Sequence, residues 1–261
     1  MPLQEVATSK LWYRLDGREG APFLVFSNSL GATHAMWEGQ VEPLAPYFRI
    51  LRYDTRGHGQ SQVMPGPYSI AALGEDLLQL TQILGIERFS FCGLSMGGMI
   101  GQWLASHAPQ RIQRLALCNT GTRIGTPEVW NERIAVAETK GMAALVDGAM
   151  DRWFTKDFQR SHPSEVGRIR DSVLGINPKG YAACMGAIRD ADLRRDLGRI
   201  RAPTLVVAGS EDPATPPSLS EAICNAIAGA RQVTLPAAHI SNIEAKAAFD
   251  EALVRFLTGR T

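Results

Sequence analysis

The sequence lacks the marks of a membrane protein or a nucleic-acid-binding protein. It has no apolar run of the roughly 18 residues or more that a membrane-spanning helix needs. Its 27 lysines and arginines are nearly balanced by 26 aspartates and glutamates, and charges of one sign do not gather in a long run. The formal net charge of +1 therefore gives no reason to expect nucleic acid or a membrane surface as a partner.

Cysteine is also scarce, and the four cysteines do not have the spacing of metal ligands or redox pairs. They are Cys92, Cys118, Cys184 and Cys224, with no C-x-x-C pattern among them. Cys92 and Cys118 each end an apolar stretch, so we expect buried free thiols. We predict neither a metal nor a cofactor. Residues 1–10 lack the basic and then apolar pattern of a signal peptide, which favours a cytoplasmic location.

The chain does have enough hydrophobic residues, 45% of the total, to bury a sizeable core. Short apolar stretches alternate with helical patterns up to residue 121 and again from residue 192. This order is typical of a mostly parallel sheet with helices on both faces. We therefore predict an α/β fold whose core is formed by residues 1–121 and 192–261. The predicted strands are 23–27, 50–53, 89–92, 115–118, 202–209 and 231–235.

The stretch between these segments, residues 122–191, has helical patterns and no strand signal. One helix is expected to begin at Thr126 and Pro127, a capping hydroxyl followed by a proline suited to the first turn. Further helices are predicted over 142–154, 164–173 and 178–188. A helical insertion between core strands is typical of a cap, or lid, that selects the substrate and excludes water.

The most specific motif is G-L-S-M-G at residues 93–97, between a predicted strand and a predicted helix. A turn tight enough to expose the hydroxyl of Ser95 forces its backbone into strained angles, and glycines on both sides leave room for that turn. The start of the following helix directs backbone N–H groups at negative charge forming beside Ser95. The motif therefore indicates a nucleophilic serine.

Candidate partners for Ser95 follow in the order acid, then histidine. Asp212 follows the predicted strand 202–209 and His239 follows the last predicted strand, so both leave the carboxyl end of a strand. Parallel sheets build their sites at that edge. The order predicts His239 as the general base and Asp212 as the carboxylate that orients it. Glu211 is adjacent and stays an alternative for the acid.

These motifs resemble the α/β-hydrolase family, and the resemblance covers nearly the whole chain. The segment D-T-R-G-H-G-Q-S at 54–61 is similar to the family's turn after an early strand. Other segments resemble, more narrowly, the 3-oxoadipate enol-lactonases. These are residues 27–31, 52–59, 119–121 with 124–127, and 238–244. One departure concerns Asn28 and Ser29, which stand where many members of the wider family have His-Gly.

The resemblance implies a cofactor-free serine hydrolase that opens 3-oxoadipate enol-lactone in the β-ketoadipate pathway of aromatic-compound breakdown. Ser95 would attack the lactone carbonyl, and the backbone N–H groups of Leu30 and Met96 would form the oxyanion hole. His239 would then activate the water that clears the acyl-enzyme. The alternatives are C–C bond hydrolases of ring-cleavage products, small-molecule carboxylesterases or perhydrolases, and a slow-turnover ligand receptor on the same fold.

A carboxylated lactone needs a local cation, because the chain as a whole is nearly neutral. Arg133 is one helical turn from Trp130 and shares a face with it, while Arg189 and Arg123 are rivals for the same role. The predicted substrate-binding residues are Ser29, Trp130, Arg133 and Arg189. The sequence leaves open which lactone or ester is the substrate and whether the protein is a monomer or a homo-oligomer.

Overall fold

The computed structural model describes residues 3–259, so the outermost positions of the predicted core, 1–2 and 260–261, lie outside the described chain. Eight strands form one sheet. They are β1 (Leu3–Val6), β2 (Ser9–Gly17), β3 (Phe23–Ser27), β4 (Arg49–Tyr53), β5 (Phe89–Leu94), β6 (Ile112–Cys118), β7 (Thr204–Gly209) and β8 (Arg231–Leu235). The helices outside 122–191 are α1 (Glu38–Leu44), α2 (Ile70–Ile83), α3 (Met96–His107), α9 (Pro217–Ala226), α10 (Ser241–Glu244) and α11 (Lys246–Thr258).

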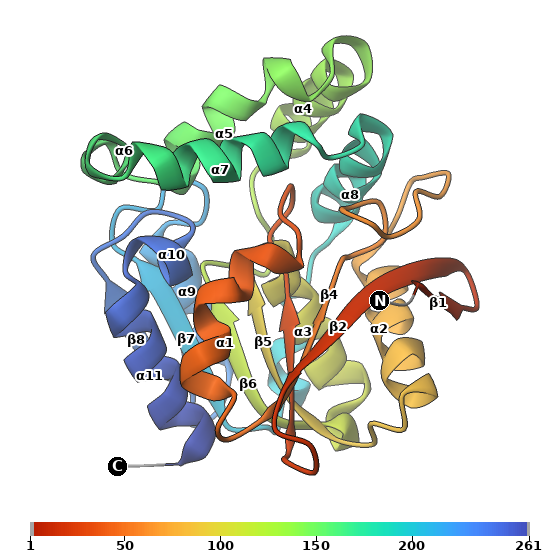
Figure 1. Ribbon diagram of the computed structural model, residues 1–261, viewed down its shortest axis with the longest axis vertical. Coiled ribbons are helices and arrows are strands. Elements are labelled where there is room, and N and C mark those ends of the chain that lie inside the picture. Colours follow the sequence, from red (N-terminus) through yellow and green to blue (C-terminus); the bar gives the residue numbers. More distant parts are fainter. Residues whose placement is uncertain (1–2, 260–261) are drawn as a thin grey trace.

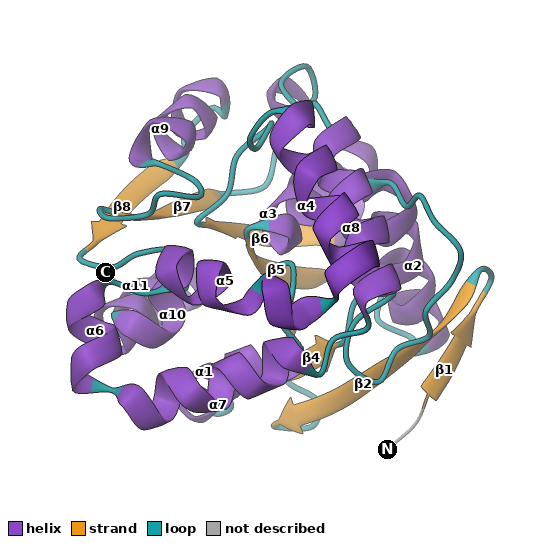
Figure 2. Cartoon of the chain, turned by 90° about the horizontal axis from the view of Figure 1, so that it is seen from above, coloured by secondary structure: helices purple, strands orange, loops and turns teal. Residues whose placement is uncertain are grey.

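The strand order across the sheet is β1-β2-β4-β3-β5-β6-β7-β8 (Figure 1). β2 pairs antiparallel with β1 and β4, and all other neighbours are parallel. Helices α2, α3 and α9 cover one face, and α1 and α11 cover the other (Figure 2). The predicted mostly parallel α/β sheet with helices on both faces is confirmed.

Burial on both faces explains why the central strands are continuous apolar runs. Every residue of β5 and of β7 is buried, as expected for strands covered by helices on each side. The antiparallel β1 and β2 are not predicted by these patterns, because polar and half-exposed side chains interrupt both strands. Helix α1 is not predicted either, because it has only seven residues and contains a proline.

Residues 127–190 form five helices that lie together over one edge of the sheet (Figure 1). They are α4 (Pro127–Lys140), α5 (Val146–Trp153), α6 (Lys156–Ser161), α7 (Pro163–Leu174) and α8 (Pro178–Asp190). Seen from above, they cover the edge at which β5 ends and α3 begins (Figure 2). Within residues 3–259, no helix has both the length and the apolar character needed to cross a bilayer.

Two details of this helical segment differ from the prediction. Helix α4 begins at Pro127, but the Thr126 hydroxyl makes no capping bond to the helix backbone. The Thr126 hydroxyl instead lowers the pKa of the Glu128 carboxyl in the first turn. The helix predicted over 142–154 is a 3₁₀ turn, Met142–Ala144, followed by α5, and the two are separated at Leu145, whose φ of −111° departs from helical geometry.

Candidate active site

Ser95 occupies the sharp turn between β5 and α3. Its φ of 58° and ψ of −115° lie in a region that non-glycine residues rarely adopt. Two hydrogen bonds hold this backbone: the Ser95 N–H donates to the Cys118 carbonyl (2.9 Å), and the Thr120 hydroxyl donates to the Ser95 carbonyl (2.7 Å). The strained turn is thus fixed by the neighbouring strand β6 and the loop that follows it.

The two glycines of the motif are required by close backbone approaches. A Cβ at Gly93 would lie 2.2 Å from the Gly97 carbonyl oxygen, and one at Gly97 would lie 2.2 Å from the Ser27 carbonyl oxygen. Neither backbone oxygen can move aside without disrupting the sheet or the helix. These contacts give the G-x-S-x-G spacing its physical reason in this chain.

Asp212 and His239 meet above the ends of β7 and β8. His239 Nδ1 lies 2.8 Å from Asp212 Oδ2, and both side chains are buried. Burial alone raises the pKa of Asp212, but the charge of His239 and several hydrogen bonds outweigh it and lower the pKa to about 2. The carboxylate is therefore ionised at neutral pH and oriented to accept a proton-bearing Nδ1.

Residues that the sequence reasoning missed complete the surroundings of Asp212. Its Oδ1 accepts the N–H groups of Ala214 (2.8 Å) and Thr215 (2.9 Å). Its Oδ2 accepts the Thr215 hydroxyl (2.6 Å) and the Asn119 side-chain amide (3.0 Å). The alternative acid, Glu211, is exposed and lines a separate surface depression. Of the two neighbouring acids, only Asp212 reaches the histidine.

Ser95 and His239 line one cavity of about 190 Å³ between the sheet and the overlying helices. Within residues 3–259, no hydrogen bond joins the Ser95 hydroxyl to the imidazole. Catalytic hydrogen bonds of this kind are often long without substrate and shorten in the reactive complex. The remaining lining residues are Ser29, Leu30, Ile124, Gly125, Val129, Trp130, Arg133, Arg152, Trp153, Tyr181, Ile188, Pro213, Ala214 and Thr215.

The predicted oxyanion donors lie beside Ser95. Met96 is the first residue of α3, so its N–H has no acceptor inside the helix. Leu30 lines the cavity, and its loop is tied to α3 by the Gly97 N–H, which donates to the Asn28 carbonyl (3.0 Å). The Asn28 side chain donates to the Tyr53 carbonyl (2.8 Å). Asn28, which stands with Ser29 where many members of the wider family have His-Gly, thus anchors the loop.

Two arginines reach the cavity, and the sequence reasoning named one of them. Arg133 stacks its guanidinium 4.7 Å from the Trp130 ring centre, and among the described residues its buried Nε has no hydrogen-bond partner. Arg152 of α5 was not predicted. Burial, followed by the charge of Arg133, lowers the pKa of Arg152. No acidic side chain of the described residues lines this cavity, so it is suited to an anion.

The other candidate arginines do not line the cavity. Arg189 bonds to both carboxylate oxygens of Asp190 (2.7 Å each) and to the Asn131 side chain (2.8 Å), so its charge is neutralised at the surface. Arg123 is exposed. Of the predicted substrate-binding residues, the structure therefore brings Ser29, Trp130 and Arg133 together with Ser95.

The loop that carries His239 is joined to the helical segment by Glu244. One carboxylate oxygen of Glu244 accepts the N–H (3.0 Å) and the hydroxyl (2.5 Å) of Thr155, and the other accepts the Ala238 N–H (2.8 Å). The Ile240 N–H also donates to the carbonyl of Trp153 at the end of α5 (3.0 Å). The 238–244 segment singled out in the sequence thus links the histidine to the overlying helices.

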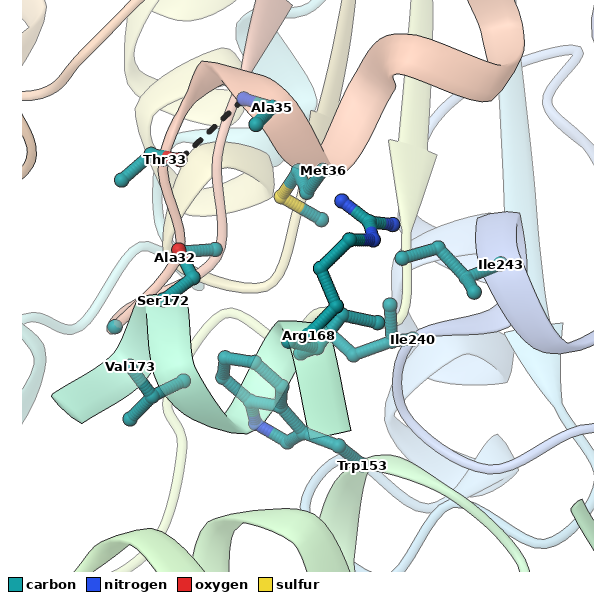
Figure 3. A pocket seen from close by; sticks show the side chains of 12 residues that line it. Ala32, Thr33, Ala35, Met36, Trp153, Arg168, Ser172, Val173, Ile240 and Ile243 are labelled. Carbon is teal, nitrogen blue, oxygen red and sulfur yellow. Dashed lines mark hydrogen bonds between the residues drawn. The ribbon is translucent and has the colours of Figure 1, made fainter. Parts of the chain in front are cut away.

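Trp153 also lines a second, much smaller cavity of about 30 Å³ (Figure 3). Its other walls are mostly apolar and include Met36, Val173, Ile240 and Ile243. It lies between the loop after β3, helix α7 and the loop after β8. A space of this size holds about one water-sized group. The larger cavity is therefore the only one of the two with room for a substrate.

Comparisons with known proteins agree with this architecture. A model of the alpha/beta hydrolase fold family matches residues 22–246. The chain is 38% identical over 250 residues to 3-oxoadipate enol-lactonase 2 of Acinetobacter baylyi, with 96% of this chain and 92% of that protein covered. It is 48% identical to the enol-lactonase from Burkholderia xenovorans LB400, with a TM-score of 0.97 over 98% of this chain and 100% of that one. A thermophilic esterase from Thermogutta terrifontis, solved with malate bound, shares 30% identity and a TM-score of 0.89, with 96% and 94% covered.

Proposed function

Because the chain belongs to the alpha/beta hydrolase fold family, we propose that it is a serine hydrolase that opens 3-oxoadipate enol-lactone to 3-oxoadipate. The observation that carries the proposal is that Ser95 and His239 share one cavity with two arginines, and that no acidic side chain among residues 3–259 lines it. Similarity to two enol-lactonases along nearly the whole chain supports this substrate. The malate bound to the related esterase supports a carboxylated ligand.

In the first half of the proposed reaction, Ser95 Oγ attacks the lactone carbonyl while His239 takes its proton. Asp212 stabilises the imidazolium that forms. The N–H groups of Leu30 and Met96 hold the oxyanion, and one such donor contributes about 3 kcal/mol to lowering the barrier. The ring C–O bond then breaks and leaves an acyl-serine. The departing oxygen is an enolate, a better leaving group than an alkoxide. It takes the proton from the His239 imidazolium and tautomerises to the ketone, which leaves the imidazole neutral for the second half.

In the second half, a water molecule attacks the acyl-serine. His239 removes a proton from that water and returns one to Ser95 Oγ as the acyl C–O bond breaks. Water is a weak nucleophile, so this step makes the greater demand on the base. Trp130, Arg133 and Arg152, which line the cavity, belong to residues 122–191. In this proposal these residues act as a cap that covers the cavity and limits how much water reaches the site.

Arg133 and Arg152 are assigned to the substrate carboxylate. Arg152→Gln and Arg133→Gln should each raise KM for the lactone by about 10- to 100-fold, because each loses a charged hydrogen bond. Hydrolysis of a neutral ester such as p-nitrophenyl acetate should change by less than about threefold, since it has no carboxylate to hold. Arg189→Gln is the matched control, and equal losses on both substrates would contradict the assignment.

The proposed function is tested by steady-state hydrolysis of 3-oxoadipate enol-lactone, with p-nitrophenyl acetate as comparison. A kcat/KM for the lactone above about 10⁴ M⁻¹s⁻¹, well above that for the ester, is expected of a dedicated enzyme. Cleavage of the ester without the lactone would leave a serine hydrolase with another substrate. At most one equivalent of product from either compound would instead indicate a slow-turnover receptor.

A further inference from the structure

A buried histidine that the proposed reaction does not use contacts the loop of the oxyanion hole. His58 lies in the turn after β4 and is 1% exposed. Its Nε2 accepts the backbone N–H of Gly31 at 2.8 Å. A backbone amide can only donate, so Nε2 carries no proton and the neutral ring is protonated at Nδ1.

Gly31 is the neighbour of Leu30, the proposed oxyanion donor. The Ala32 N–H donates to the Ser29 carbonyl (3.1 Å), so residues 29–32 form a turn with Leu30 and Gly31 at its corners. Gly31 has a φ of +81°, the value that the third position of a type II turn requires. The bond to His58 therefore holds the central peptide of the turn that presents the Leu30 N–H.

The imidazole of His58 packs against helix α8 on its other side. Its Nδ1 lies 3.8 Å from Cys184 Sγ of α8, and that sulfur lies 3.5 Å from the carbonyl oxygen of Arg56. Burial lowers the pKa of His58 to about 4, so the ring is neutral, and able to accept, at neutral pH. The nearby carboxylate of Asp54 is hydrogen-bonded to another histidine, His34. Its Oδ1 accepts the backbone N–H of His34 (2.8 Å) and lies 2.9 Å from the Nδ1 of that residue.

We propose that His58 is a positioning residue for catalysis: by accepting the Gly31 N–H, it keeps the Leu30 N–H aimed at the oxyanion formed at Ser95. This inference rests on the proposed function, in which Leu30 is an oxyanion donor. A histidine that merely fills space would be replaceable by any side chain of similar volume. A positioning histidine is replaceable only by another acceptor at the same place.

Three variants separate these roles. His58→Phe keeps a ring but loses the acceptor, His58→Gln can place a carbonyl oxygen near the former Nε2, and Cys184→Ala disturbs the packing on the opposite side. His58→Phe should lower kcat for p-nitrophenyl acetate by about 10- to 100-fold, somewhat less than the loss of a whole oxyanion donor. KM should stay within about threefold. His58→Gln should recover most of the loss, and Cys184→Ala should leave kcat within about twofold.

Binding of a boronic acid gives a readout that a structural defect would not reproduce. The boronate forms a tetrahedral adduct with Ser95 and places an oxygen in the oxyanion hole, so His58→Phe should weaken it in proportion to the loss in kcat/KM. Affinity for 3-oxoadipate, a product that forms no tetrahedral adduct with Ser95, should hardly change. The inference is overturned if His58→Phe lowers the affinity for both ligands equally. It is also overturned if kcat of His58→Gln is as low as that of His58→Phe, or if kcat of His58→Phe equals that of the wild type.

The wild-type protein provides a test that needs no variant to fold. With ¹⁵N-labelled histidine and glycine, the Nε2 of His58 should be unprotonated and should show scalar coupling to the Gly31 amide nitrogen across the hydrogen bond. A protonated Nε2 would overturn the inference. If the wild type hydrolyses neither substrate, the proposed function fails, whereas active wild type with an equally active His58→Phe removes only the role of His58.

Discussion

Ser95→Ala is expected to lower kcat for the lactone by about 10⁶-fold, the loss typical of removing a serine nucleophile that acts with a histidine. Without the hydroxyl no acyl-enzyme can form, and the oxyanion hole and cavity alone supply little catalysis. Folding should be unaffected, because both hydrogen bonds that hold the strained turn use the backbone of Ser95. The measurements are steady-state hydrolysis and a thermal unfolding curve recorded on the same preparation.

Covalent labelling provides the control for this variant. A phosphonate that reacts with activated serines should add one adduct mass to the wild type, located by peptide mapping at Ser95, and none to Ser95→Ala. A variant that folds and retains more than about 1% of wild-type kcat would show that Ser95 is not the nucleophile.

Asp212→Asn is expected to lower kcat by about 10⁴-fold, because an amide neither stabilises the imidazolium nor selects the Nδ1-protonated tautomer of His239. Asp212 is not among the residues that line the cavity, so KM should change little. The pKa of about 2 keeps the wild-type carboxylate ionised from mildly acidic to alkaline pH. Activity lost on mild acidification therefore cannot come from protonation of Asp212.

Glu211→Gln is the matched control for that experiment. It removes the same charge one residue earlier in the chain, but Glu211 is exposed and lies outside the cavity. It should retain kcat within about twofold. If Glu211→Gln were the damaging change and Asp212→Asn were active, the acid would have to be reassigned.

The parallel part of the sheet could be predicted because burial on both faces leaves an apolar run at each strand. The run at residues 23–27 matches β3 at both ends, and the run at 50–53 lies within β4 and ends with it. The antiparallel strands β1 and β2 could not be found in this way. Half-exposed strands such as β2 (Ser9–Gly17) carry lysine, arginine and aspartate, which hide the strand pattern.

For the candidate site, the sequence predicts residues best where the backbone itself demands a residue type. The glycines around Ser95 are of this kind. Arg133, Arg152 and Arg189 show the opposite case, because helical spacing gives a face but not what that face meets. Arg189 bonds to Asp190 beside it, whereas Arg152 lines the same cavity as Arg133 from a different helix. The only sequence hint for Arg152 is its place before Trp153 in the segment predicted to be a cap.

The carboxylate of Glu244 sets a limit on how this protein can be recombined with its relatives. It bonds at once to Thr155 in the helical segment and to Ala238 beside the histidine. A chimera that exchanges residues 122–191 alone would keep Glu244 and could lose the threonine that it holds, leaving a charge without its partner and a histidine loop without its anchor. The unit that can be exchanged between such enzymes is therefore discontinuous: the helical segment together with residues 237–244. Libraries that shuffle substrate preference should cross over at the borders of both pieces.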